Sequence, residues 1–189
     1  MCLNKGGRIL SISASRLAQL FALSALIVAA TAGNAAAQTS PDRGGFTLLV
    51  NLGVGFQNDT GIEESAVGFA GLNLGVGGFI KPNLAILGRS SGTSASYETA
   101  FGDFRQVSGV VGATLQYWTS DKVYLEGGAG VGVWSADDES DKGFGLILGA
   151  GYTVWNRGKH NLQVGVEYAP AFTDGAVHNF GITFGYQLF

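Results

Sequence analysis

The chain has 189 residues, of which 31 are glycine and only 13% are charged, and its mean hydropathy is +0.23. An average domain has about 25% charged residues and about 7% glycine. This apolar composition excludes an intrinsically disordered chain, and the presence of only 3 prolines excludes collagen. The net charge of -3 argues against a nucleic-acid-binding protein, which usually carries a basic patch.

Residues 1–37 have the layout of a secretory signal peptide. The start contains no acidic residue, and its cations are Lys5, Arg8 and Arg16. An apolar stretch follows over 20–32, shorter than the roughly 18 residues that a membrane-spanning helix needs. The alanines at 35–37 then supply small side chains for cleavage. We therefore expect a cleaved signal peptide and one mature domain over 38–189.

From residue 46 onward, apolar side chains occupy every second position over most of the chain. The first such segment alternates through Phe46, Leu48, Val50, Leu52, Val54 and Phe56. A period of two predicts a strand, because successive side chains point to opposite faces of a sheet. The pattern returns, more weakly at 84–94, over 70–77, 84–94, 107–117, 123–133, 144–154, 162–168 and 180–188. These segments predict about eight strands of roughly ten residues, the length that a tilted membrane strand needs.

The connections between these segments alternate in length. Short turns are predicted at 81–83, 120–122 and 156–159, and longer polar connections at 57–65, 91–105, 135–142 and 172–177. In an up-and-down barrel this alternation puts all short turns at one end. Outer-membrane barrels have that asymmetry, with short turns on the periplasmic side.

The composition of the two strand faces favours a membrane barrel. The face opposite the apolar one consists mostly of Gly, Thr, Asn and Gln, with fewer charges than a water-facing surface carries. An apolar face that meets lipid needs no charged residues. A face rich in glycine and small polar side chains fits the narrow interior of such a barrel. Aromatic residues on the apolar face predict two interfacial girdles: Phe46, Tyr117, Tyr152 and Tyr186 near the short turns, and Phe56, Phe144, Tyr168 and Phe180 near the long connections. A soluble secreted ligand-binding barrel, with the faces reversed, is an alternative.

The pattern resembles the small OmpA/OmpX-like family of eight-stranded outer-membrane β-barrels. The resemblance covers 38–189 and is most specific over 180–189, which read FGITFGYQLF. It implies an all-β, antiparallel up-and-down transmembrane β-barrel in the outer membrane of a Gram-negative-type envelope. Outer-membrane lipid and lipopolysaccharide are then its surroundings. The resemblance also implies that the barrel-assembly machinery reads Phe189, although this residue is out of phase with the apolar positions before it.

Three charged residues fall on the interior face by parity: Arg89, Glu126 and Glu167. Because a buried charge is costly unless it is paired, we expect an arginine–carboxylate network that fills the lumen. A polar path for ions or protons is the alternative. An eight-stranded barrel is normally filled by side chains, which favours the closed lumen.

No catalytic set can be assembled from the sequence. Some eight-stranded outer-membrane barrels are lipid A-modifying hydrolases with a histidine and a serine two residues apart on a strand. Here His178 is followed by Asn179 and Phe180, and His160 falls in a predicted turn. The acidic run at 137–141 lacks the spacing of an EF-hand and is interpreted as a solvated loop.

We therefore expect a protein without enzymatic activity, cofactor, metal or nucleic-acid partner. Its expected role is structural or one of surface interaction, with an unidentified extracellular partner. A narrow porin-like channel for small solutes or ions is the alternative function.

Overall fold

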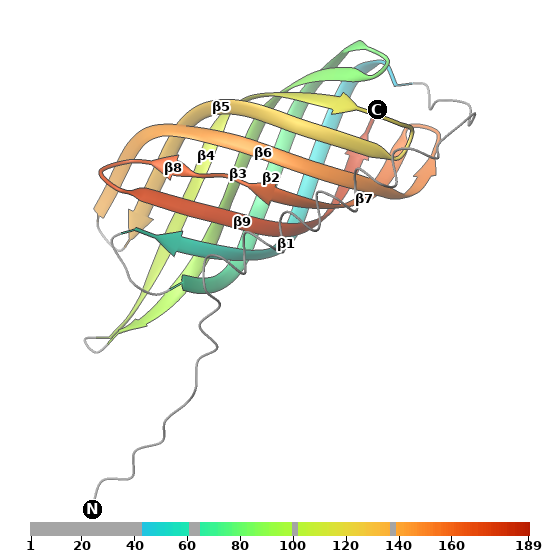
Figure 1. The fold of residues 1–189 in the computed structure, drawn as a ribbon. Coiled ribbons are helices and arrows are strands. Elements are labelled where there is room, and N and C mark those ends of the chain that lie inside the picture. The colour runs from blue at the N-terminus through green and yellow to red at the C-terminus, as the bar shows by residue number, and fades with distance from the viewer. Residues whose placement is uncertain (1–42, 61–64, 100–101, 137–138) are drawn as a thin grey trace, which may run out of the picture.

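The computed structural model describes residues 43–60, 65–99, 102–136 and 139–189. These residues form antiparallel strands that wrap into a barrel (Figure 1). The strands are β1 (Gly45–Asp59), β2 (Ser65–Lys81), β3 (Leu84–Thr99), β4 (Gly102–Trp118), β5 (Val123–Ala136), β6 (Glu139–Arg157), β7 (His160–Tyr168), β8 (Ala171–Phe172) and β9 (Ala176–Leu188). The predicted signal peptide lies outside the described residues. Within the described ranges, no helix is long and apolar enough to cross a membrane.

The nine strands form an eight-stranded wall, because β7 and β8 share one position in it. Both pair with β6 on one side and with β9 on the other. Ala169 and Pro170 separate them, and proline has no N–H to donate to a ladder. Hydrogen bonds from Ala169 N to Asn179 O (2.8 Å) and from Leu146 N to Pro170 O (3.1 Å) keep the wall continuous there. Pairing of β1 with β9 closes the barrel, which confirms the predicted fold class.

The two faces of the wall differ in polarity in the way a lipid-embedded barrel requires. Large apolar side chains point outward and stay exposed, among them Val67, Leu72, Ile80, Val111, Ile182 and Phe184. The fully buried interior side chains include five glutamines: Gln57, Gln106, Gln116, Gln163 and Gln187. Each of these amides makes at least one hydrogen bond to a polar side chain inside, as when Gln187 Nε2 donates to Gln116 Oε1 at 2.8 Å. The polar core and apolar exterior reverse the arrangement of a soluble barrel.

The ends of the barrel differ from the sequence prediction in one respect. The predicted long connection over 91–105 is mostly strand, since β3 and β4 pair in register as far as Thr99 and Gly102. Strands other than β7 and β8 are 13 to 19 residues long, well above the predicted ten. The extra residues at the outer end of β3, from Ser90 to Thr99, are rich in Ser and Thr and lack apolar alternation. The part of a hairpin that extends out of the membrane does not need an apolar face. Its residues therefore show no alternating apolar pattern, although the strands still pair.

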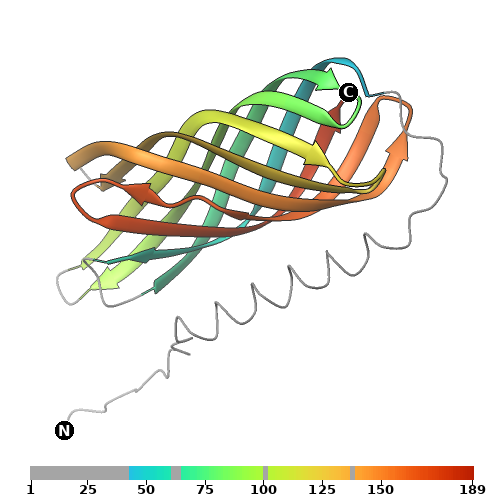
Figure 2. The same ribbon diagram turned by 45° about the horizontal axis from the view of Figure 1, so that its top comes forward.

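The two ends of the barrel differ in their connections, and we call them the inner end and the outer end. The inner end, at the right of Figure 1, holds the turns after β2, β4 and β6 and the marked C-terminus. Arg43 lies at the same end, against the rings of Trp118 and Phe189. The outer end holds the extended hairpins β1–β2, β3–β4 and β5–β6, and Figure 2 shows them at the opposite end of the wall. At the inner end the β6–β7 turn has only two residues, with Gly158 at a φ of 61°. A positive φ of this kind suits a tight hairpin turn.

Candidate functional site

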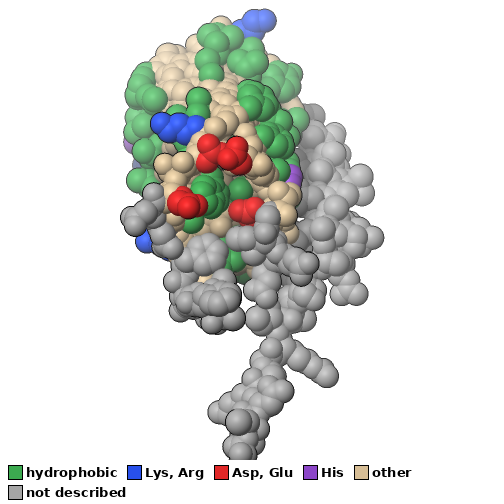
Figure 3. All heavy atoms as spheres, turned by 90° about the vertical axis from the view of Figure 1, so that its left-hand side faces the viewer, with side chains coloured by type: hydrophobic (Ala, Val, Ile, Leu, Met, Phe, Trp, Pro, Cys, Tyr) green, Lys and Arg blue, Asp and Glu red, His purple; other side chains and the backbone are tan. Residues whose placement is uncertain are grey.

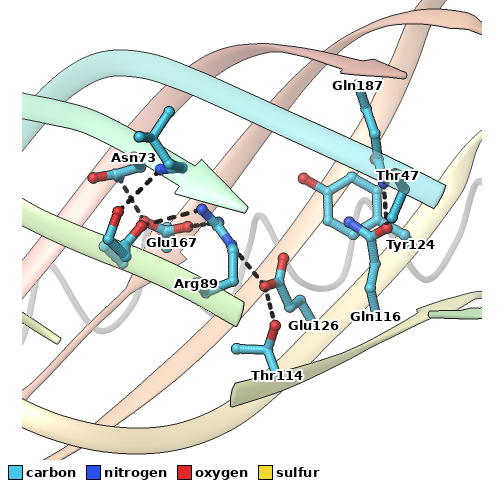
Figure 4. A network of polar contacts seen from close by, with 12 residues as sticks. Thr47, Asn73, Arg89, Thr114, Gln116, Tyr124, Glu126, Glu167 and Gln187 are labelled. Atoms are coloured by element: carbon cyan, nitrogen blue, oxygen red, sulfur yellow. Dashed lines mark hydrogen bonds and ion pairs between the residues drawn. The ribbon is translucent and has the colours of Figure 1, made fainter. Parts of the chain in front are cut away.

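The centre of the lumen is occupied by a charged network around Arg89. This side chain extends from β3 and lies between Glu126 of β5 and Glu167 of β7 (Figure 4). Its Nε donates to Glu126 Oε1 at 2.8 Å, and its Nη2 donates to Glu167 Oε2. The three residues are only 3%, 6% and 6% exposed. The charged residues that parity placed inside therefore lie together as two ion pairs that share one guanidinium.

Neutral donors complete this central network. Thr114 Oγ1 donates to Glu126 Oε1 at 2.7 Å, and Asn73 Nδ2 donates to Glu167 Oε1 at 2.8 Å. The Ser91 hydroxyl also donates to Glu167 Oε1. Each carboxylate thus accepts from the guanidinium and from at least one neutral group. Buried ions require this kind of compensation, because every unpaired polar group in a low-dielectric interior is costly.

Glycines give the network its space. Gly75 and Gly112 lie directly across from Arg89 on the two neighbouring strands. Gly149 of β6 lies between the two acids, opposite Glu126 on one side and Glu167 on the other. A Cβ placed on Gly75 would come within 2.8 Å of Arg89 Cδ. Part of the glycine excess therefore serves to leave room for long charged side chains.

A second obstruction closes the inner end of the lumen. We call it the inner aromatic cluster: Trp118, Tyr124 and Phe189, all nearly fully buried, with Phe79 packed against them. The Phe189 ring lies edge-on to Trp118, with centroids 5.5 Å apart, and edge-on to Phe79 at 5.6 Å. Phe189 thus packs on the interior side, which accounts for its being out of phase with the lipid-facing residues before it.

Arg43 covers this cluster. Its guanidinium lies 3.9 Å from the centroid of the Trp118 ring and 5.3 Å from that of Phe189. Its Nη2 also donates to the backbone oxygen of Asp121 at 2.6 Å. Burial lowers the pKa of Arg43 to about 10, and the charge of Asp121 opposes that shift. Arg43 therefore remains cationic at neutral pH and keeps its cation–π contacts.

The outer end of the barrel is hollow and acidic. A cavity of about 750 Å³ opens there, and its lining includes Asp59, Glu139, Asp141 and Asp174 together with Trp134 and residues between β8 and β9. Figure 3 views this end and shows acidic side chains gathered around it. Within the described residues, no group of three or more acidic, histidine or cysteine side chains is arranged to hold a metal ion. Of the acidic run at 137–141, the first two residues lie outside the described ranges and the rest begin β6.

The predicted girdle aromatics differ in how far they are exposed. Phe46, Tyr117, Phe144 and Tyr152 are exposed, whereas Phe56, Tyr168, Phe180 and Tyr186 are half-buried. Three of the half-buried residues contact neighbouring rings: Tyr168 stacks on Phe180 with centroids 4.5 Å apart, and Tyr186 lies beside the ring of His160. Four further aromatic residues that were not among the predicted girdle positions are exposed in the described part of the chain: Phe69, Trp155, Phe172 and Phe184.

Both histidines lie on the β7–β9 seam, and each is bonded to a tyrosine. His178 Nδ1 is 2.7 Å from the Tyr168 hydroxyl near the outer end, and His160 Nδ1 is 2.5 Å from the Tyr186 hydroxyl at the inner end. Each pair joins one residue of β7 to one of β9. One pair thus lies at each aromatic girdle, and both bridge β7 and β9. Neither hydrogen bond involves a serine or a carboxylate.

Comparison with known proteins gives a family match that spans most of the chain. The model of the outer membrane protein beta-barrel domain family matches residues 22–187. The chain belongs to this family. Membership agrees with the apolar exterior and polar lumen, and it places the chain in the cell outer membrane. The alternative of a soluble secreted barrel is therefore wrong, because the exposed apolar face meets lipid.

Solved structures share the fold of this family member. Ail of Yersinia pestis, in complex with the heparin analogue sucrose octasulfate, matches with a TM-score of 0.55 and 17% identity, over 77% of this chain and 99% of that one. Neisserial surface protein A matches with a TM-score of 0.53 and 17% identity, over 76% and 96%. A search of curated proteins gives no match.

Proposed function

We propose that this outer-membrane barrel does not conduct and that it acts by surface interaction through its outer end. The observation that carries the proposal is the obstruction of the lumen at two levels, by the central network and by the inner aromatic cluster. The large cavity lies at the outer end, where a partner outside the cell would meet it.

The packing around the central network argues against the porin-like alternative. The guanidinium of Arg89 spans the lumen between two carboxylates. The free space beside Glu167 and Asn73 is about 10 Å³, roughly the volume that one water molecule needs. A hydrated ion would have to displace the buried ion pairs and then the packed rings of the inner aromatic cluster. We infer that this barrier suppresses conduction.

Planar-bilayer recording tests the closed lumen directly. We expect the purified protein to show no unitary current steps, even at high protein concentration. Heat-modifiable migration on gels and flotation with vesicles are the controls that show folded, inserted protein in the same preparation. Regular conductance steps from such a preparation would overturn the proposal and support the narrow channel.

The charge of the outer end favours a basic partner. Ail is seen with a polyanion, whereas the outer cavity of this chain is lined by four carboxylates. Opposite charges steer association and like charges suppress it, so a polyanion should be repelled here. Sequence identity of 17% shows only a shared fold, and the difference in ligand follows from this chain's own residues.

Binding to protein in zwitterionic nanodiscs tests this preference. We expect polylysine to bind and sucrose octasulfate not to bind, with polylysine affinity falling in Asp141→Asn/Asp174→Asn. Asp121→Asn, at the inner end, is the matched control and should leave the affinity unchanged. Binding of sucrose octasulfate in place of polylysine would contradict the proposed partner class.

The described residues supply no observation in favour of an enzyme. Each histidine is hydrogen-bonded to a tyrosine on the lipid-facing seam. Hydrolysis by a side-chain nucleophile requires a base hydrogen-bonded to that nucleophile. The described residues show no serine or threonine hydroxyl bonded to a histidine. We infer that the protein has no catalytic role.

A further inference from the structure

The exposed cations at the inner end form a ring that the surface-interaction role does not use. We call it the inner rim: Lys81, Lys122, Arg157 and Lys159, all exposed. Lys81 ends β2, Lys122 lies in the β4–β5 turn, and the last two flank Gly158 in the β6–β7 turn. Every hairpin turn at this end therefore contributes at least one cation.

Backbone hydrogen bonds hold these turns around one circumference. Trp118 N donates to Asn83 O at 2.9 Å, which joins the β2–β3 turn to β4. Thr153 N donates to Lys122 O at 2.7 Å, and Phe189 N donates to Lys159 O at 2.9 Å. The cations are thus fixed at the edge of a continuous wall and spread around it, not gathered in one patch.

The positive charge of the inner rim is not neutralised by neighbouring side chains. None of its four members forms an ion pair with a described residue. The acid of these turns, Asp121, lies beside the buried Arg43. At the outer end the balance is reversed, since four acids line the cavity. The barrel therefore carries positive charge at one membrane surface and negative charge at the other.

Amphipathic aromatic side chains lie immediately beside the inner rim. Tyr152 and Trp155 are exposed on β6 just before Arg157, and Tyr117 is exposed on β4 just before its turn. Such rings favour the headgroup level of a bilayer. Lys and Arg beyond them can keep their stems on the apolar surface and extend their charges toward lipid phosphates.

We propose that the inner rim binds anionic phospholipid headgroups in the leaflet that the short turns face. The distribution of cations around the whole wall fits a surrounding shell of lipid better than a soluble partner, which would contact one side. Each basic residue near an anionic membrane surface adds to the attraction, and salt screens it. This inference is independent of the contact proposed for the outer end.

Lipid association in proteoliposomes tests the proposal. The probes are spin-labelled phosphatidylglycerol and spin-labelled phosphatidylcholine, each added at trace level to phosphatidylcholine vesicles that contain residues 38–189. We expect the immobilised fraction to favour phosphatidylglycerol by at least about twofold, and the preference to vanish at about 1 M salt, where the screening length is about 3 Å.

Charge-removing variants locate the effect. Lys81→Gln/Lys122→Gln/Arg157→Gln/Lys159→Gln should lose the preference, whereas Arg105→Gln/Lys142→Gln at the outer end should keep it. Equal immobilisation of the two lipids by the wild type would overturn the proposal without any variant. A preference that survives in the inner-rim variant would also overturn it. Retention by the wild type of an acidic soluble protein, with no lipid preference, would identify a protein partner and reject the lipid.

Discussion

Arg89 and Glu126 lie 37 positions apart in the sequence and on strands that are not neighbours, yet Arg89 Nε and Glu126 Oε1 are 2.8 Å apart. The bond therefore crosses the lumen and does not follow the wall. Together with the bond to Glu167, it ties β3, β5 and β7 through the interior. The barrel is held by its core as well as by its backbone ladders.

Removing the guanidinium should cost stability. Arg89→Met leaves two buried carboxylates without their cation, and we expect the free energy of unfolding to fall by about 3–5 kcal/mol. Urea unfolding in micelles measures it. Arg105→Met, which removes an exposed arginine at the outer end, is the control and should change little. Neutralising both acids in the Arg89→Met background should recover part of the loss; the same unfolding curve for all variants would refute the pairing.

The space provided by Gly75 can be tested separately. A methyl group there would crowd Arg89 Cδ, so we expect Gly75→Ala to destabilise the barrel by about 1–3 kcal/mol through overpacking. Gly88 is exposed on β3, and a methyl group at that position would have its nearest neighbour, Val76 O, at an ordinary contact distance of 3.7 Å. Gly88→Ala is therefore expected to be neutral. Equal effects of the two substitutions in urea titrations would count against a spatial role for Gly75.

The contact of Arg43 with the inner aromatic cluster predicts a particular pH dependence. Burial lowers the pKa of Arg43 to about 10, below its value in the unfolded chain, so Arg43 is protonated in both states below about pH 9. The stability difference between wild type and Arg43→Met should then be constant from pH 5 to about pH 9. Above about pH 10 the unfolded chain holds more protons than the folded one. The free energy of unfolding of the wild type should therefore rise with pH relative to that of Arg43→Met. Guanidinium unfolding at a series of pH values measures this stability difference. A difference that changes with pH between pH 5 and about pH 8 would contradict the prediction.

The hydrogen bond between Tyr168 and His178 near the outer end should make a small contribution to the stability of the barrel. Tyr168→Phe removes the hydroxyl that lies 2.7 Å from His178 Nδ1 while keeping the ring stacked on Phe180. We expect a loss of about 1 kcal/mol. Tyr117→Phe is the matched control, because it removes an exposed tyrosine hydroxyl from the other girdle. Thermal unfolding in detergent should separate the two variants, and a larger effect at Tyr117 would reject the assigned bond.

The sequence was most informative where one face meets lipid. Alternation through residues such as Val50, Leu52 and Val54 predicted the wall and its faces, because lipid tolerates only apolar side chains there. Parity then assigned Arg89 to the interior with no knowledge of its partners. Over 91–105 the alternation ended while the strands continued, since pairing in water needs no apolar face.

Other features depend on strand stagger and could not be predicted. Which acids reach Arg89 is determined by the tilt and register of strands that are not adjacent, and no sequence spacing encodes them. The neutral donors Asn73 and Thr114 gave no signal for the same reason. Arg43 precedes the first alternating segment, so nothing in the pattern indicated that it covers Trp118.

The closing seam has a consequence for how this barrel folds. Other neighbouring strands are joined by short connections, whereas β1 and β9 pair between residues as distant as Leu48 and Leu188. Thr47 Oγ1 also donates to Leu188 O at 2.6 Å, across 141 positions of sequence. Contacts of such long range form slowly, because the intervening chain must be ordered first. Hairpins can therefore assemble one after another, but the last pairing forms in a single late event that also brings Phe189 to Trp118. A chain arrested before that event would expose the edges of β1 and β9 together, which makes partly assembled barrels the species most prone to pair with one another.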